Sequence, residues 1–177
     1  MILIGDAPAQ TAARQADWIV AMEPWRSLGF SREGLTRFLR QSARRAGGVL
    51  VASAGKRGPV LGIVCVQEGV LLGNFVALLA VKPEAAGQGT GRALMDAVAQ
   101  RTFATRRWLY VSVDRENRAA RAFYRKLGFR PVGRLPDLVR PGRLEILLRR
   151  AAPATDTTAS PGRRAPARRT VRGRGRA

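Results

Sequence analysis

The sequence predicts an α+β fold: a mixed, mostly antiparallel sheet with a central β-α-β unit and flanking helices. Three observations lead to this prediction. Apolar residues recur at helical spacing near the N-terminus, strand-like runs fill residues 48–81, and helical and strand-like segments alternate over residues 90–127. A strand–helix–strand unit inside an otherwise antiparallel sheet is typical of the α+β class.

Two helices are expected before the first strand. Residues 11–30 carry apolar side chains at helical spacing, and Pro24 ends or bends this helix because proline cannot continue the hydrogen-bond ladder. Ser31 can cap a second helix. Gly34 stands where a full capping box has Glu or Gln. The apolar positions of the two helices are Ala12, Ala16, Ile19 and Val20, and then Leu35, Phe38 and Leu39.

The remaining elements follow in the order β, β, β, α, β, α, β, β. The runs GVLVASA and VLGIVCVQEG are joined by the turn KRGP and predict a hairpin, and NFVALLAV predicts a third strand. A helix is expected over residues 90–102, a strand in WLYVSVD, and a helix over residues 117–127 that Gly128 ends. Residues 130–134 and 143–149 can close the sheet as an antiparallel pair.

One folded domain is predicted for residues 1–150, followed by a disordered Arg-rich tail over residues 151–177. A chain of 177 residues suffices for one domain with a sizeable core. The tail contains one large apolar residue, Val171, so it cannot bury enough surface to offset the entropy of ordering. No apolar run is long enough to span a membrane. No signal peptide is expected either, so we expect a cytoplasmic protein without a membrane partner.

The residue types limit the possible chemistry. The chain has no histidine, which excludes histidine acid–base catalysis, Ser–His and Cys–His nucleophiles and most zinc sites, and no metal is expected. The single cysteine, Cys65, lies in the apolar run GIVCV and is interpreted as a core residue. An enzyme of this composition must move protons with Tyr, Asp, Glu or water.

The chain is strongly basic, with a net charge of +20. The tail carries seven Arg and one Asp, so residues 1–150 are basic in their own right at +14. Only three of the 32 basic residues are lysine, and this bias toward arginine fits the codon usage of a GC-rich genome. The functional alternative is attraction to an anion such as a nucleic acid, an acidic partner or a phosphorylated cofactor.

The segment VKPEAAGQGTGRALM combines a strand end, a glycine-rich turn and the start of a helix. Gly87, Gly89 and Gly91 fit neither the dinucleotide fingerprint nor the P-loop spacing. The physical arrangement is nevertheless similar, because the first N–H groups of a helix lack intrahelical partners and lie at the positive end of its dipole. Glycines allow a phosphate to approach these groups closely.

This segment resembles the acyl-coenzyme A loop of the GNAT superfamily of N-acyltransferases. A second segment, LYVSVDRENRAARAFYRKLGFRPVG, carries Asn117, Ala120, Tyr124, Gly128 and Phe129 at the spacing that the superfamily uses. The resemblance covers residues 79–133 at the level of motif and most of residues 1–150 at the level of element order. It implies a GNAT-type fold and an acetyl-CoA-dependent N-acetyltransferase that transfers the acetyl group directly to a primary amine.

The resemblance also implies roles for individual residues. Backbone N–H groups would hold the pyrophosphate, the backbone of Leu79 and Val81 would pair with the pantetheine arm, and Asn117 would bond the same arm. Tyr124 would face the thioester sulfur as proton donor. The loop departs from the superfamily at Ala86, where Gln or Arg is usual, so we expect weaker cofactor binding. The pyrophosphate loop comprises Gly87, Gln88, Gly89, Thr90, Gly91 and Arg92.

The sequence does not assign the general base to one residue or the acceptor to one class of amine. Asp114, Glu23, Glu68 and an ordered water are the candidates for the base. The acceptor site is expected where the segment EPWRSLGF covers the sheet, with Trp25 and Phe30 as lining residues or as ordinary core residues. The acceptor is a small-molecule amine, a peptide N-terminus or a lysine.

The sequence also allows two functions other than catalysis. The chain can be a family member that binds coenzyme A without catalysis, or a nucleic-acid or ribosome binder on the same scaffold. Nucleic acid binding through the tail is not favoured, because the tail has no aromatic residue to stack on bases. The chain is expected to be a monomer or a homodimer.

Overall fold

The computed structural model describes residues 1–45 and 47–153. The last strand ends at Ala151, one residue into the predicted tail. The prediction of disorder for residues 154–177 lies outside the described residues. None of the helices in the described part of the chain is long and apolar enough to cross a membrane.

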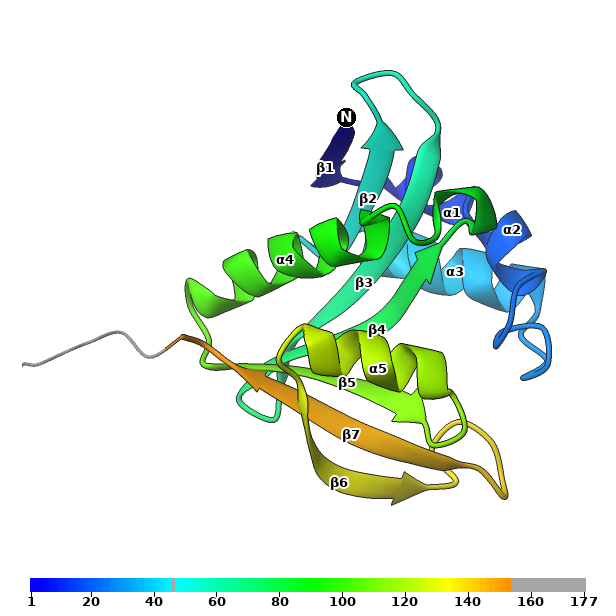
Figure 1. Ribbon diagram of the computed structural model, residues 1–177. Helices are drawn as coiled ribbons and strands as arrows, with labels where there is room; N and C mark the ends of the chain where they lie inside the picture. Colours follow the sequence, from blue (N-terminus) through cyan, green and yellow to red (C-terminus); the bar gives the residue numbers. More distant parts are fainter. Residues whose placement is uncertain (46, 154–177) are drawn as a thin grey trace, which may run out of the picture.

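The predicted α+β class is confirmed, with a mixed, mostly antiparallel seven-stranded sheet in the order β1-β2-β3-β4-β5-β7-β6 (Figure 1). Every neighbouring pair is antiparallel except β4–β5, which is parallel because α4 returns the chain to the same end of the sheet. The strands are β1 (Ile2–Asp6), β2 (Val49–Ala54), β3 (Val60–Val70), β4 (Gly73–Val81), β5 (Trp108–Asp114), β6 (Arg130–Pro136) and β7 (Leu144–Ala151).

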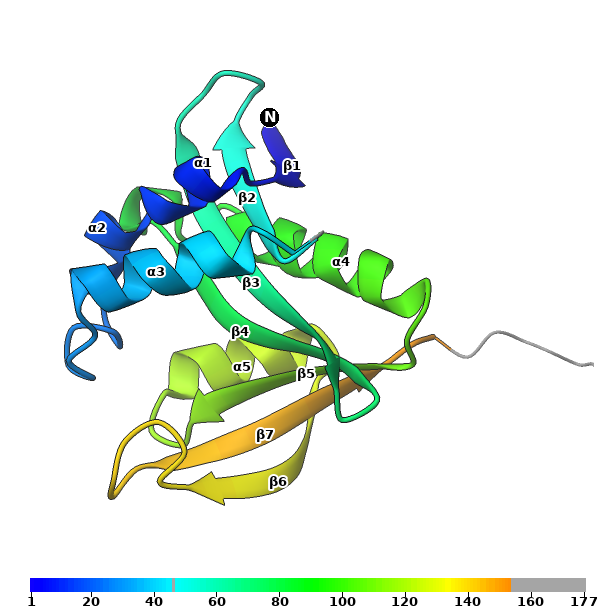
Figure 2. The same ribbon diagram turned by 180° about the vertical axis from the view of Figure 1, so that it is seen from behind.

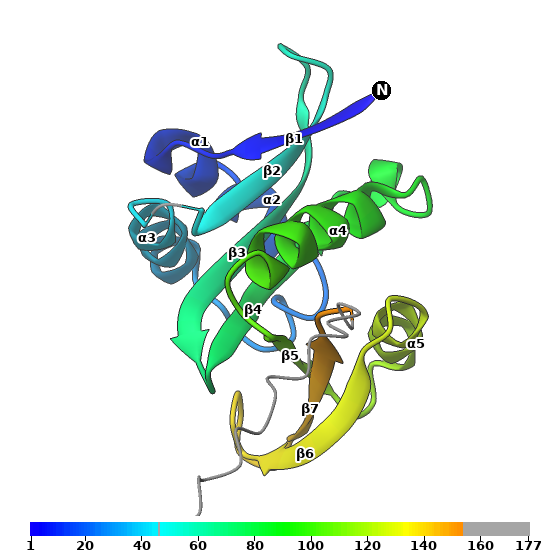
Figure 3. The same ribbon diagram turned by 90° about the vertical axis from the view of Figure 1, so that its left-hand side faces the viewer.

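Helices cover both faces of the sheet. Viewed along the sheet, α1 and α3 lie on one side and α4 and α5 on the other (Figure 3), and the rear view shows α1, α2 and α3 together over β2, β3 and β4 (Figure 2). The helices are α1 (Ala9–Ala13), α2 (Ala16–Val20), α3 (Arg32–Ser42), the 3₁₀ turn η1 (Pro83–Ala85), α4 (Thr90–Phe103) and α5 (Arg118–Lys126).

The strands at the centre of the sheet read as continuous apolar runs because they are buried on both faces. Val49 and Val51 of β2 pack under α1 to α3, whereas Leu50 and Ala52 pack under α4 and α5. Cys65 of β3 lies in the first of these two layers, fully buried, and burial raises the pKa of its thiol to about 12. The prediction that Cys65 is a core residue is therefore confirmed.

The N-terminal region differs from the prediction in two ways. Residues 2–6 (ILIGD) form an additional edge strand paired with β2, which the sequence analysis did not predict. The single helix expected after it is two short helices, which break at Arg14 and Gln15. Ala12, Ala16 and Ile19 are all fully buried, so one apolar face continues across the break and the periodicity alone does not show it.

Candidate active site

A cleft opens in the middle of the sheet where β4 and β5 separate. The two strands pair over three residues only, from Asn74 opposite Leu109 to Val76 opposite Val111. On the other edge of β4, Val76 pairs with Val66 and Leu78 with Cys65, which leaves Ala77 as the extra residue of a β-bulge. A bulge bends its strand and ends regular pairing. Beyond Ala77, the edge of β4 that faces β5 is therefore without a strand partner in the described part of the chain.

The cleft contains a cavity of about 200 Å³. Its walls come from β4, from β5, from one face of α5 and from the segment between α2 and α3. The cavity thus passes between the strands, from the α5 face of the sheet to the opposite face. Its lining includes Trp25, Leu28, Phe30, Leu79, Ser112, Asp114, Asn117, Tyr124, Val139 and Glu145.

The glycine loop lies at the far end of β4 and leads into α4. Gly87 and Gly89 have φ angles of 75° and 83°, which strain any residue with a Cβ. Gly89 is the N-cap of α4, and the first bond of the helix runs from the Ala93 N–H to the Gly89 carbonyl. The N–H groups of residues 90–92 therefore precede the hydrogen-bonded ladder and can bind an anion.

Two side chains of this loop, those of Gln88 and Thr90, are already engaged or enclosed. The Gln88 amide donates to the Glu84 carbonyl at 2.7 Å, and the Thr90 hydroxyl is buried without a hydrogen-bond partner among the described residues. A Cβ on Gly91 would lie 3.4 Å from Cζ of Phe123 and 3.5 Å from Cγ2 of Val81. Gly91 thus allows α4 to approach α5 and the end of β4.

Asn117 and Tyr124 share one face of α5, and both line the cavity. The Asn117 Oδ1 accepts the Ala120 N–H at 3.0 Å, so this residue caps the helix while its amide NH₂ remains available for a ligand. Tyr124 is 7 % exposed, and its ring packs edge-on against Phe123 and Phe129. Burial raises the pKa of the Tyr124 phenol, so this group stays protonated at neutral pH.

Two carboxylates lie at the base of the cavity, on neighbouring strands. Asp114 of β5 pairs with Glu145 of β7 in the strand register. The Asp114 side chain is 13 % exposed, and its Oδ2 accepts hydrogen bonds from Nε and Nη2 of Arg143 at 2.7 and 2.6 Å. Its Oδ1 accepts the Glu116 N–H. Asp114 is therefore held as an ion pair with Arg143.

Glu145 is 6 % exposed and is the functional candidate that sequence reasoning missed. Burial raises the pKa of its carboxyl group, a hydrogen bond from Ser112 lowers it, the charge of Asp114 raises it and the charge of Arg143 lowers it, for a net upward shift. A single carboxylate inside the apolar run LEILL was the available signal. This signal does not show which cavity the side chain reaches, because that depends on the register of β7 against β5.

The other predicted bases lie elsewhere. Glu23 is exposed and forms an ion pair with Arg26 at 2.8 Å, and it is not among the described residues that line the cavity. Glu68 is exposed on β3, opposite Asn74, outside the cavity lining. Trp25 and Phe30, in contrast, both line the cavity on the face of the sheet opposite α5. The structure thus brings together Leu79, Asn117, Tyr124, Asp114 and the two aromatic residues, with the glycine loop at the end of β4.

Comparisons with known proteins identify a matching family and structures with a similar fold. The acetyltransferase (GNAT) domain family matches residues 45–131. Ard1 from Thermoplasma volcanium has a similar structure, with a TM-score of 0.70, 19% identity, and coverage of 85% of this chain and 97% of that chain. A GNAT-family acetyltransferase from Bacillus cereus ATCC 10987 is similar as well, with a TM-score of 0.67 and 16% identity over 85% of this chain and 97% of that chain.

The ribosomal-protein-S18-alanine N-acetyltransferase from Escherichia coli is similar too, with a TM-score of 0.64 and 18% identity over 90% of this chain and 99% of that chain. At these identities the three structures establish a shared fold. The search of curated proteins gave no match.

Proposed function

Because the chain belongs to the GNAT superfamily of acetyltransferases, we propose that it transfers an acetyl group from acetyl-CoA directly to a primary amine. One observation carries the proposal: beyond Val76 the edge of β4 that faces β5 has no strand partner among the described residues, and this open edge offers a path between the glycine loop and the cavity that Tyr124 and Glu145 line. GNAT acetyltransferases act on small-molecule or protein acceptors.

The residues along this path fit coenzyme A. The positive φ angles of Gly87 and Gly89 and the free N–H groups at the start of α4 suit a pyrophosphate, held by the backbone of residues 87–92. The unpaired edge of β4 at Leu79 and Val81 suits an extended amide-bearing arm, with the Asn117 NH₂ as a further donor. Acetyl-CoA bound in this way supplies the activated thioester.

Tyr124 supports departure of the thiol. Its raised pKa keeps the hydroxyl protonated, and the hydroxyl belongs to a residue that lines the cavity beside Asn117. Tyr124 donates a hydrogen bond, and then the proton, to the sulfur as the C–S bond breaks and charge develops there. Solvent returns the proton to the phenol.

Glu145 serves as the base that removes the proton from the acceptor. An ammonium group must lose a proton before it can attack, and a carboxylate with a raised pKa accepts that proton more readily than an ordinary one. Asp114 is less suited to this role because its Oδ2 accepts from Arg143 twice and its Oδ1 accepts the Glu116 N–H. We therefore assign Asp114 and Arg143 to the orientation of the strand end and the proton transfer to Glu145.

The acceptor side of the cavity combines apolar walls with these carboxylates. Trp25, Leu28, Phe30 and Val139 line the opening, and Phe30 and Val139 are exposed. A cationic amine next to an apolar group would place its charge near Glu145 and its apolar part against the aromatic residues. Small amines, peptide N-termini and lysine side chains all offer this chemistry.

The test is a screen of amines, peptides and proteins with acetyl-CoA, with released coenzyme A thiol as the readout. Acceptors with an apolar group beside the amine should give the highest rates. A chain that is stabilised by acetyl-CoA but releases no thiol with any acceptor would be a non-catalytic coenzyme A binder, and the proposed reaction would be wrong.

A further inference from the structure

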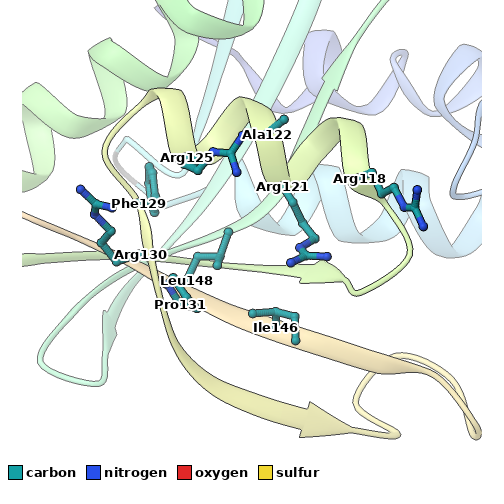
Figure 4. Close-up of a pocket in the computed structure, with 9 residues that line it drawn as sticks. All are labelled: Arg118, Arg121, Ala122, Arg125, Phe129, Arg130, Pro131, Ile146 and Leu148. Atoms are coloured by element: carbon teal, nitrogen blue, oxygen red, sulfur yellow. The ribbon is translucent and has the colours of Figure 1, made fainter.

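A second cavity, of about 450 Å³, lies on the other side of α5 from the cleft, between this helix and strands β6 and β7 (Figure 4). Arg118, Arg121 and Arg125 project from α5, and Arg130 from the start of β6. The rest of the lining is largely apolar, and its floor consists of the exposed Pro131, the half-buried Ile146 and the buried Phe129 and Leu148. The cavity therefore has basic walls above an apolar base.

This cavity is separate from the proposed cofactor path. Asn117, Ala120 and Tyr124 recur every three or four residues and face the cleft. Arg118, Arg121 and Arg125 have the same spacing on an adjoining face of α5 and line the second cavity instead. The helix thus separates two sites, and neither the glycine loop nor β4 contributes to the second one.

The four guanidinium groups carry no carboxylate partner. Among residues 1–45 and 47–153, none of Arg118, Arg121, Arg125 and Arg130 takes part in an ion pair. Arg121 donates one hydrogen bond, to the Arg115 carbonyl at 3.1 Å. Arginine stays charged at any physiological pH, so four positive charges share one cavity without compensation in this part of the chain. An anionic ligand would supply that compensation.

The cavity continues into a groove along β6. A neighbouring hollow shares Arg121, Pro131 and Ile146 with it and adds Arg134 and Val132, the latter 43 % exposed. Residues 115–134 contain seven basic residues and one acidic residue. The two hollows thus share the apolar residues Pro131 and Ile146 and the basic residue Arg121.

We propose that this groove binds an acidic segment of a partner protein, with carboxylates on the arginines and apolar side chains on the floor. Charge complementarity requires an anionic occupant, and arginine forks match carboxylates geometrically. A nucleic acid fits less well, because Phe129, the one aromatic residue of the lining, is too deeply buried to stack on a base. A phosphate backbone would also leave the accessible apolar residues Pro131 and Ile146 unused. The chain's own residues 151–177, with a net charge of +6, would be repelled.

The test measures binding of three fluorescein-labelled probes to the full chain by fluorescence anisotropy, without acetyl-CoA. The probes are the peptide DLEFDLEF, an octamer of glutamate, and a single-stranded RNA of mixed sequence. DLEFDLEF should bind most tightly. Arg125→Glu with Arg130→Glu should weaken its binding about tenfold or more, which corresponds to about 1.4 kcal/mol.

Matched variants distinguish binding in the groove from a general effect of basic charge. They also distinguish the contribution of the apolar floor from that of the arginines. Arg37→Glu with Arg40→Glu makes the same charge change on the exposed side of α3 and should leave the affinity for DLEFDLEF within about twofold. Ile146→Thr should weaken DLEFDLEF but not the glutamate octamer. Equal losses from both arginine pairs would overturn the site, and so would an unchanged affinity after Arg125→Glu with Arg130→Glu. If the RNA binds more tightly than DLEFDLEF and Arg125→Glu with Arg130→Glu abolishes its binding, the occupant of the groove is a nucleic acid and not an acidic protein segment.

Discussion

Asp114 and Glu145 lie directly opposite each other across the β5–β7 ladder, but their carboxyl groups have different surroundings. Asp114 is neutralised by Arg143 at 2.6 Å, whereas Glu145 is more deeply buried and the pKa of its carboxyl group is raised. Environments that separate two neighbouring carboxyl groups in this way commonly assign them different roles. Four predictions follow from this pair and its surroundings, and a fifth concerns the end of the chain.

Glu145→Gln should lower kcat by roughly 10²–10⁴, the usual contribution of a general base. The wild-type kcat should fall as the pH drops through the raised pKa of Glu145, and the variant should lose this acid limb. Glu68→Gln changes an exposed carboxylate outside the cavity and should leave both quantities unaltered. A variant Glu145→Gln with the wild-type pH profile would transfer the role to Asp114 or to water.

Glu145 should also make stability depend on pH. Because the folded-state pKa is raised above its ordinary value of 4.5, its favourable contribution is complete below the unfolded pKa and is lost as the pH rises through the folded one. The free energy of unfolding of Glu145→Gln relative to wild type should therefore increase from about pH 4 to about pH 8. Urea titrations at both pH values measure this difference. A constant difference across the range would mean that Glu145 is not buried as described.

Tyr124→Phe should lower kcat by roughly 10²–10⁴ with the dissociation constant of acetyl-CoA nearly unchanged, because the ring and its packing are retained. Tyr110→Phe is the matched control: Tyr110 is also buried, but its hydroxyl donates to the Leu71 carbonyl at 3.3 Å, outside the cleft. It should affect stability and leave kcat intact. Full kcat in Tyr124→Phe, with chemistry rate-limiting, would assign the tyrosine a structural role.

Acetyl-CoA at about 100 times its dissociation constant should raise the free energy of unfolding by about 2.7 kcal/mol. Gly89→Asp should abolish this effect, since it strains a residue at φ 83° and places a negative charge at the phosphate loop. Gln88→Ala leaves the backbone cradle intact and should retain most of the effect. Thermal melts with and without the ligand, with circular dichroism to verify folding, make the measurement. A melting temperature that millimolar acetyl-CoA does not move would contradict the cofactor assignment.

Removal of residues 154–177 should leave acetyl transfer to a small acceptor unchanged. These residues follow β7, which ends at Ala151, and the described residues that line the cleft all precede them in the chain. Steady-state kinetics of the full chain and of a chain ending at Pro153 provide the comparison. A loss of acetyl-CoA stabilisation in the shorter chain would show that the tail contributes to the cofactor site.

Much of the fold could be predicted because its signals are local. The glycine loop ahead of α4 and the stop at Gly128, with φ 86°, both depend on the backbone conformation of single residues, which glycine reveals in the sequence. The edge strand β1 was missed because its pairing with β2, from Ile2 opposite Ala54 to Asp6 opposite Leu50, joins segments far apart in the chain. No local pattern encodes such a pairing.

The candidate site likewise contains residues that local sequence patterns predict and residues that only the tertiary structure brings together. Asn117 and Tyr124 lie on one helix, so their common face follows from their spacing of seven residues. Glu145 reaches the same cavity from β7 only through the strand register, and the bulge at Ala77 that opens the cavity depends on how β3 and β4 pair. The arginine partners that distinguish Asp114 from Glu145 also come from tertiary structure.

Burial of Cys65 has a practical consequence for kinetic work. A thiol with a pKa of about 12, enclosed beneath α1 to α3, does not react with disulfide or maleimide reagents while the chain stays folded. A colorimetric thiol reagent added during turnover will therefore report released coenzyme A with no background from the protein. Because Cys65 is unreactive in the folded chain, a cysteine introduced on the surface, for example at Arg37, can carry a single fluorescent dye without removal of the native residue.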